Sequence, residues 1–247
     1  MAPPALLFGL VSPEPFQAEW NLRLLRDFFS LLPHNGTRDA VAQFFVLNAL
    51  ASTWLCSGVF YAYWRMEDEL TVWRRSHLLA VSVALCLVTT ITLFVRPWFG
   101  WPAPSLVARF RPLYPPYLWN DGNANCFPSH STLIYLSIAL GFWPFKRWLS
   151  ALLVLYVLVL ISLPRIYVGG HYPIDVLAGI LLAAGVAWMA RLALAQARIH
   201  ARFESIVSRG LALEVFLFLW LFELAEGFRS SYWILSSVAR AARSIGR

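Results

Sequence analysis

Long apolar stretches alternate with short polar ones along the chain, and six of them approach the twenty residues with which a helix crosses a bilayer. These stretches cover residues 40–63, 77–95, 129–145, 148–164, 174–194 and 211–228. The last one contains Glu214, Glu223 and Glu226, so it fits a tilted span, a helix that faces the bundle or an interfacial helix. The pattern predicts an all-α fold, a polytopic membrane bundle of about five to six transmembrane helices.

An amphipathic segment precedes the first apolar stretch. Over residues 16–32, large apolar side chains recur on one side of a helix, namely Phe16, Trp20, Leu24, Phe28 and Leu31. We expect this helix to lie on the membrane surface. The chain then divides into an interfacial segment at 1–39, a membrane core at 40–194 and a C-terminal segment at 195–247 with the sixth helix.

The composition supports a membrane protein, because 59% of the residues are hydrophobic and only 13% are charged. Soluble domains carry about twice that charged fraction. The net charge of +7 fits loops that face lipid headgroups, and no basic tract with interleaved aromatics indicates a nucleic-acid site. The three cysteines form no metal-type spacing with histidine and no disulfide framework, so we expect neither a metal site nor another cofactor.

Basic residues in the loops predict the orientation of the bundle. The loops after the first, third and fifth stretches contain Arg65, Arg74, Arg75, Lys146, Arg147, Arg191, Arg198, Arg202 and Arg209. The positive-inside rule places these loops in the cytoplasm, and the loops around residues 96–128 and 165–175 on the outer side. Four arginines after residue 228 oppose this orientation if the sixth stretch crosses the membrane.

The run Arg165-Ile-Tyr-Val-Gly-Gly-His171-Tyr-Pro-Ile-Asp175 leads into the fifth stretch. Pro173 suits the first turn of a helix, where its missing N–H costs nothing. Asp175 then lies one turn after His171, where its carboxylate can accept a hydrogen bond from one imidazole nitrogen and leave the other free to attack. Arg165 offers a fork of donors suited to phosphate oxygens. Each residue alone fits a structural role, but the three together favour a nucleophilic site.

Further polar residues fall at the same membrane face if neighbouring helices are antiparallel. Arg96 ends the second stretch, Ser129 and His130 begin the third, and Arg165 ends the fourth. Two helix N-termini also point their free N–H groups toward that face, and such termini attract phosphate. The convergence predicts a site for a phosphate ester or anhydride.

These motifs resemble the type 2 phosphatidic acid phosphatase superfamily, which contains metal-independent acid phosphatases and membrane lipid phosphatases. The family pattern has three parts: Lys, six residues, Arg-Pro; then Pro-Ser-Gly-His; then Ser-Arg, five residues, His, three residues, Asp. The third part matches at Arg165, His171 and Asp175, with Pro164 in place of the serine. The resemblance covers about residues 40–194.

The first two parts depart from the family pattern. Arg96-Pro97 matches the end of the first part, but Thr89 stands at the lysine position, and Arg109 or Arg111 is a candidate substitute. The second part, Pro128-Ser129-His130-Ser131, is one residue short. Either His130 keeps the role of the family histidine, or Ser131 holds that position and His130 holds that of the glycine.

Within the family the layout most resembles bacterial undecaprenyl-diphosphate phosphatases. The resemblance implies that His171 attacks the terminal phosphorus, that Asp175 stabilises the imidazolium, and that His130 protonates the leaving oxygen and then activates water. The phosphate oxygens would be held by Arg96, Arg165 and Ser129. No cofactor or metal is implied. The protein would lie in the bacterial inner (cytoplasmic) membrane as a multi-pass protein, with its site facing the periplasm or exterior.

Three functions fit these residues. The first is hydrolysis of a lipid phosphate or diphosphate, with undecaprenyl diphosphate favoured. The second is transfer of the phosphoryl group to a glycan or lipid acceptor through the same phosphohistidine. The third is a non-catalytic lipid-binding role, which the missing lysine and the shortened second motif favour and the intact third motif opposes. The expected partners are a lipid phosphate and the membrane, without nucleic acid.

Overall fold

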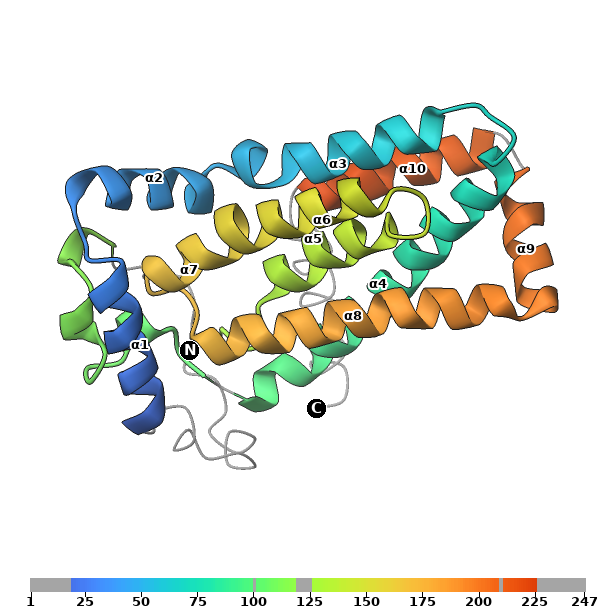
Figure 1. The fold of residues 1–247 in the computed structure, drawn as a ribbon. Coiled ribbons are helices and arrows are strands. Elements are labelled where there is room, and N and C mark those ends of the chain that lie inside the picture. Colours follow the sequence, from blue (N-terminus) through green and yellow to red (C-terminus); the bar gives the residue numbers. More distant parts are fainter. Residues whose placement is uncertain (1–18, 100, 119–125, 209–210, 226–247) are drawn as a thin grey trace, which may run out of the picture.

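The computed structural model describes residues 19–99, 101–118, 126–208 and 211–225, and every regular element within those ranges is helical (Figure 1). The predicted all-α bundle is therefore confirmed. Three helical stretches are long and apolar enough to cross a membrane, Thr71–Val95, Arg147–Tyr167 and Pro173–Ala195. They correspond to the second, fourth and fifth predicted spans, and the total of five to six spans stays a prediction.

Two predicted spans differ from the helices in the structure. The first, 40–63, is divided at Asn48 into α2 (Gly36–Leu47) and α3 (Ala49–Arg65), so a continuous helix there was wrong. Asn48 has an extended backbone, and a short polar amide favours such a break. The third is only α5 (His130–Gly141), because Pro144 cannot continue a helix toward residue 145.

The centre of the bundle is α8 (Pro173–Ala195), which packs on α5 and on α4 (Thr71–Phe99). A glycine allows the closest approach: a Cβ at Gly179 would lie 2.8 Å from the Ser129 carbonyl oxygen and 3.0 Å from Thr132 Cβ. Beside this pair run α6 (Arg147–Tyr156), the π-helical turn η4 (Val157–Ser162) and α7 (Leu163–Tyr167), which together cover the fourth predicted span. The start of α5 is thereby fixed against the first turns of α8.

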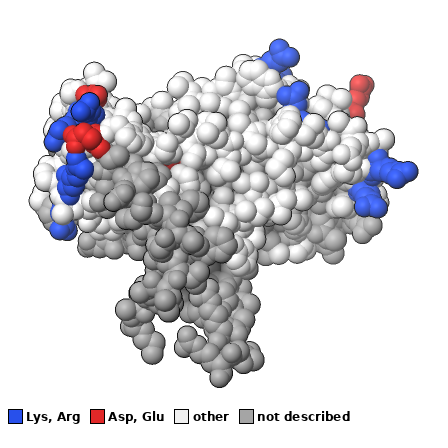
Figure 2. All heavy atoms as spheres, turned by 90° about the horizontal axis from the view of Figure 1, so that it is seen from below, with Lys and Arg blue, Asp and Glu red and all other residues white. Residues whose placement is uncertain are grey.

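Short helices cross both ends of the bundle, α1 (Glu19–Leu31) at one end and α9 (Ala197–Val207) at the other (Figure 1). Within α1, Leu22 and Leu25 are buried, whereas Trp20, Leu24 and Leu31 are exposed. An exposed apolar stripe fits the predicted surface helix. Figure 2 shows lysine and arginine gathered toward the two ends of the visible face, with a broad stretch of other residues between them, as expected for a membrane protein.

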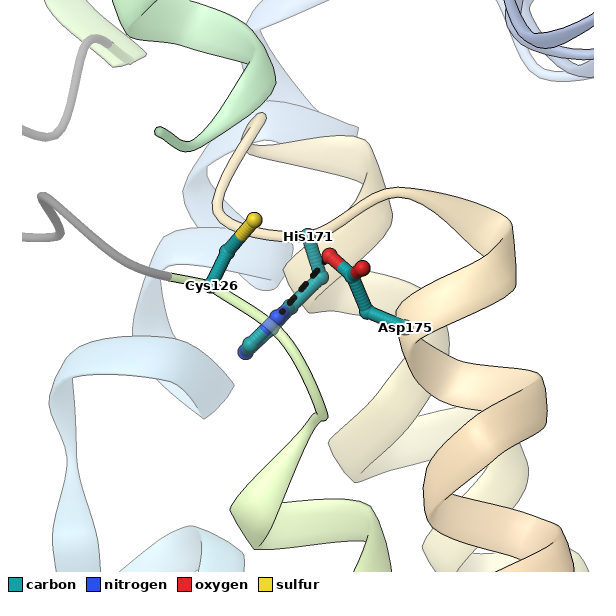
Figure 3. Close-up of side chains that lie close together, drawn as sticks. All are labelled: Cys126, His171 and Asp175. Carbon is teal, nitrogen blue, oxygen red and sulfur yellow. Dashed lines mark ion pairs between the residues drawn. The ribbon is translucent and has the colours of Figure 1, made fainter. Parts of the chain in front are cut away.

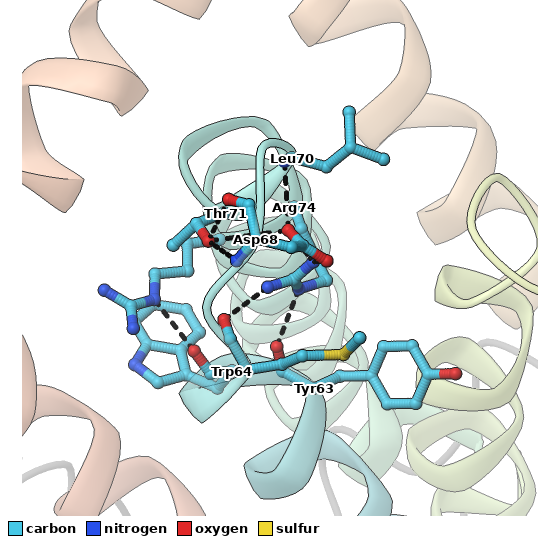
Figure 4. Close-up of polar contacts among 8 residues, drawn as sticks. Tyr63, Trp64, Asp68, Leu70, Thr71 and Arg74 are labelled. Carbon is cyan, nitrogen blue, oxygen red and sulfur yellow. Dashed lines mark hydrogen bonds and ion pairs between the residues drawn. The ribbon is translucent and has the colours of Figure 1, made fainter.

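A buried arginine fixes the turn between α3 and α4 (Figure 4). The Arg74 guanidinium is 2% exposed and donates to both carboxylate oxygens of Asp68 at 2.7 Å. It also donates to the carbonyl oxygens of Tyr63, at 2.8 Å, and Met66, at the end of α3. Hydrogen bonds from Arg74 lower the pKa of Asp68. A cation that satisfies the last carbonyls of a helix is favoured by the helix dipole, so Arg74 sets the angle between α3 and α4.

The sixth predicted stretch contains α10 (Leu211–Ala225), which lies beside α3 (Figure 1). Glu214 near its start accepts from Arg65 at the end of α3, 3.1 Å away. Both side chains are about half exposed, so the pair contributes little energy. It does mark the two helices as antiparallel. Residues 226–228 lie outside the described ranges.

Candidate active site

His171 occupies a tight turn that joins α7 to α8. Gly169 has φ of 76°, and a Cβ there would lie 2.9 Å from Ser105 Cβ, so only glycine fits. The amides of Gly170 and His171 both donate to the Arg165 carbonyl oxygen, at 2.9 and 3.2 Å. The helix α8 then begins at Pro173, as the sequence predicted. The imidazole is thus held directly before a helix N-terminus, where anionic oxygens are favoured.

The predicted pairing of His171 with Asp175 is present as a close contact. Nδ1 of His171 lies 3.5 Å from Oδ2 of Asp175, and the two residues are 8% and 0% exposed. At that distance the contact is too long for a good hydrogen bond. Oδ2 instead accepts the Tyr172 amide at 2.8 Å, which caps the first turn of α8. Among the described atoms, neither Nδ1 of His171 nor Oδ1 of Asp175 has a hydrogen-bond partner.

A third group, the Cys126 thiol, completes a compact cluster that sequence reasoning did not assign to the site (Figure 3). The potential ligand atoms of Cys126, His171 and Asp175 all lie within 4.8 Å of one another, and all three residues are buried. Cysteine, histidine and aspartate are the ligand types that zinc prefers, so this cluster could hold a thiophilic cation. The one signal in the sequence is that Cys126 lies three positions before Ser129.

Burial also affects Tyr172, the residue that follows His171. Tyr172 is 1% exposed and its ring meets Phe110 edge-on, with ring centroids 5.4 Å apart. Burial, with Cys126, Asp175 and Tyr114 nearby, raises the pKa of Tyr172 above its ordinary range. Its phenol therefore stays neutral and adds no charge beside the site.

Ser129 joins the start of α5 to the first turn of α8. Its amide donates to the Asp175 carbonyl oxygen at 3.0 Å, which connects it to the first turn of α8. Its hydroxyl lies 3.0 Å from the Thr132 hydroxyl, which lies 2.8 Å from that of Ser162 at the end of η4. All three hydroxyls are buried. Ser129 is therefore positioned by a chain of hydroxyls, and its role as a phosphate ligand stays a prediction.

His130 contacts α4 through its imidazole. Its Nε2 lies 3.0 Å from Oγ1 of Thr92, and the residue is half-buried. One turn earlier on α4 is Thr89, at the family's lysine position; it is buried, and its hydroxyl has no partner among the described atoms. The threonine thus supplies no cation. The assignment of His130 as the proton donor stays a prediction.

The two predicted arginine ligands are placed differently. Arg165 is at the end of α7, but its guanidinium donates to the Ile161 carbonyl oxygen at 2.8 Å and interacts electrostatically with Tyr135 of α5. The bond to Ile161 uses one of the five N–H donors of the guanidinium. Arg96 is in the last turn of α4, and its side chain lies outside the described part of the structure. Both phosphate-binding roles stay predictions.

The candidate substitute for the lysine has another partner. Arg109 forms an ion pair with Glu19 of α1, and both side chains are about half exposed. This pair attaches α1 to the loop between α4 and α5. Because the pair is half exposed it contributes little energy, and the role of Arg109 as a phosphate ligand stays a prediction.

A buried carboxylate anchors the N-terminal helices beside α7. Asp39 of α2 is 2% exposed; it accepts from Tyr167 of α7 at 2.8 Å, pairs with His34 at 3.0 Å and accepts from Tyr117. Burial alone would raise the pKa of Asp39, but hydrogen bonds from Tyr117, His34 and Tyr167 outweigh it and lower that pKa. Since Tyr167 lies two residues after Arg165, this network supports the turn that carries His171.

Comparison with known proteins agrees with these motifs. Residues 77–199 match the model of the PAP2 superfamily. Over 122 residues the chain is 31% identical to the protein of Escherichia coli (strain K12) named "Putative undecaprenyl-diphosphatase YbjG". The match covers 45% of this chain and 58% of that protein. No solved structure gives a significant match. Residues 77–199 contain the helix starts and the turn described above, and they place the chain in the PAP2 superfamily, as its motifs predicted.

Proposed function

We propose that the protein is a membrane lipid phosphatase that hydrolyses a lipid phosphate or diphosphate, with undecaprenyl diphosphate as the favoured substrate. The buried contact between His171 and Asp175 at the N-terminus of α8 is the observation that carries this proposal. The family match supports a phosphatase, and the relative's name supports the lipid substrate. The charge pattern of the loops favours a site on the outer face.

The proposed reaction has two displacement steps. In the first, Nε2 of His171 attacks the terminal phosphorus, the bond from phosphorus to the lipid oxygen breaks, and His130 gives a proton to that oxygen. The Asp175 carboxylate stabilises the positive charge that the ring acquires. In the second step, a water that gives a proton to His130 attacks the phosphohistidine, the P–N bond breaks and phosphate leaves.

The equatorial oxygens need positive charge and donors during both steps. Arg96 and Arg165 supply guanidinium groups, and Ser129 supplies a hydroxyl. The free N–H groups at the start of α8 add further donors. Because these groups provide the charge stabilisation, the proposed mechanism needs no metal. A non-catalytic role is favoured by Thr89 at the lysine position and by the shortened second motif at Pro128-Ser129-His130-Ser131.

Phosphate release by the purified full-length protein tests the proposal. The substrates are undecaprenyl diphosphate, a short polyprenyl diphosphate and phosphatidic acid, each with the protein in excess EDTA. We expect turnover, and an acid-labile, base-stable phosphoprotein after rapid quenching. His171→Ala should abolish both. No release from any substrate, by protein that melts cooperatively, would support the non-catalytic alternative instead.

A further inference from the structure

A cavity of about 340 Å³ lies at the end of the bundle opposite to His171. Its lining includes Trp73 and His77 from the start of α4, Trp143 and Arg147 from the turn into α6, and Arg191 from the end of α8. Since Arg191 follows Pro173 by eighteen residues of one helix, the cavity lies roughly 27 Å from the start of α8. It is therefore separate from the candidate active site, and its volume is within the usual range of ligand pockets.

The cavity carries positive charge that the protein does not neutralise. Arg147 and Arg191 are both exposed, and neither forms an ion pair with any acidic side chain in the part of the chain that the structure describes. The Arg147 guanidinium lies over the Trp143 ring, 5.9 Å from its centroid, which orients that side chain at the cavity. Two guanidinium groups at one opening suit a phosphate group.

A second hollow extends the first one along the bundle. It has a volume of about 210 Å³ and shares His77, Trp143 and Arg191 with the first cavity. Its other walls are apolar, formed by Leu140 of α5 and by Ala184, Ala187 and Trp188 of α8. The polar opening thus continues into an apolar groove. A free phosphate ion would use the opening alone, whereas a lipid would use both parts.

We propose that this pair of hollows binds an anionic glycerophospholipid. Its phosphate would lie between Arg147 and Arg191, and the start of an acyl chain would lie along Ala184 and Ala187. Trp73 and Trp143 fit this arrangement, because tryptophan is favoured at the depth of the headgroups. Basic pockets between helices at the cytoplasmic surface bind such headgroups, and the loop charges predict that this end is cytoplasmic. The inference does not depend on the proposed phosphatase activity.

Native mass spectrometry of the full-length protein in mild detergent tests the site. The probes are phosphatidylglycerol, phosphatidylcholine with the same chains, and inorganic phosphate. The key variant is Arg147→Gln with Arg191→Gln, and the matched control is Arg198→Gln with Arg202→Gln, which removes two exposed charges from α9. Two arginines contribute about 2 kcal/mol at an anionic lipid, so the key variant should bind phosphatidylglycerol about thirtyfold more weakly. The control should change this affinity less than threefold.

A third variant distinguishes a lipid from a free anion. Ala187→Phe narrows the apolar groove and leaves both arginines in place. We expect it to weaken phosphatidylglycerol at least fivefold and to leave the binding of inorganic phosphate unchanged. If the key and control variants lose affinity for phosphatidylglycerol equally, the effect is one of general surface charge and the proposal is overturned. Tight binding of inorganic phosphate, with no effect of Ala187→Phe, would overturn the lipid as the ligand. Unchanged melting temperatures would show that the exposed substitutions leave the fold intact.

Discussion

Asp175→Asn separates the two tasks that the structure gives this carboxylate. Oδ2 accepts the Tyr172 amide at 2.8 Å, and the same atom lies 3.5 Å from Nδ1 of His171. Asparagine keeps an oxygen that can accept the amide hydrogen, but it removes the negative charge beside the imidazole. The variant should therefore keep the start of α8 and lose the stabilisation of the charged ring.

The size of that loss follows from the distance between the two side chains. Two unit charges 3.5 Å apart interact by about 4.7 kcal/mol at an effective dielectric constant of about 20. Both residues are buried, so screening by solvent is weak. Each 1.36 kcal/mol of barrier is about tenfold in rate, so about three-thousandfold is the upper limit. We expect kcat to fall between about a hundredfold and this limit.

The assay is phosphate release at saturating lipid substrate, together with the melting temperature in the same detergent. Asp175→Ala loses the cap as well as the charge, so it should be about 1 kcal/mol less stable than Asp175→Asn. Glu214→Gln, which removes a carboxylate at the distant Arg65 pair, serves as the control and should keep wild-type activity. If Asp175→Asn retains kcat within threefold while His171→Ala is inactive, the carboxylate charge has no role in the reaction.

Four further predictions follow from other contacts. Gly179→Ala should lower stability by about 1–3 kcal/mol, because its Cβ would overlap the backbone of α5, and thermal melting measures this. Thr92→Val removes a hydroxyl that hydrogen-bonds to His130 and should slow hydrolysis of lipid phosphates more than that of an activated aryl phosphate. The pKa of Asp39 in the folded protein lies below its ordinary value of 3.8. The ionised carboxylate therefore stabilises the fold fully above about pH 4, and this stabilisation is lost as pH falls through the folded pKa. Asp39→Asn should make the melting temperature fall less steeply over that acid range. Activity should survive excess EDTA, and added zinc should inhibit it through the buried cluster, less so in Cys126→Ser.

Each of these predictions has an outcome that contradicts it. A Gly179→Ala variant as stable as wild type would mean that α5 and α8 can separate without cost. Equal slowing of lipid and aryl substrates by Thr92→Val would count against proton donation by His130. An Asp39→Asn variant with the wild-type acid profile would assign acid sensitivity to other groups. Loss of activity in EDTA, restored by one divalent ion, would refute the metal-free mechanism.

The sequence predicted the site best where local rules decide the structure. A proline at the first helical position and a glycine-rich turn before it are short-range signals, and α8 begins where they indicate. The placement of four helix termini at one face, the ends of α4 and α7 and the starts of α5 and α8, was predicted from one assumption. It was that neighbouring apolar helices pack antiparallel. Both inferences use only the direction of the chain and the spacing of residues along it, and both can be read from the sequence.

Side-chain direction was not predictable in the same way. The Arg165 guanidinium donates to the carbonyl oxygen of Ile161, a residue of the π-helical turn η4. The spacing of apolar residues in the sequence does not indicate a π-helical turn. Cys126 lies beside His171, and its amide donates to the Trp101 carbonyl oxygen at 2.8 Å, a contact between residues far apart in the sequence. These features arise from tertiary contacts that the local pattern does not encode.

The two proposed sites lie at opposite ends of one helix. The N-terminus of α8 points free N–H groups at the His171 site, where a phosphoryl group would gain negative charge in the reaction. Toward the other end of α8, Arg191 lines the far cavity that we propose to bind lipid. A lipid at Arg191 stabilises the folded bundle by mass action, but it changes turnover only if it binds two conformations of α8 with different affinity. The test is to measure kcat with and without phosphatidylglycerol, for the wild type and for the Arg147→Gln, Arg191→Gln variant. If phosphatidylglycerol changes kcat in the wild type but not in the variant, the two ends of α8 are coupled. If it changes kcat in neither, they are not coupled.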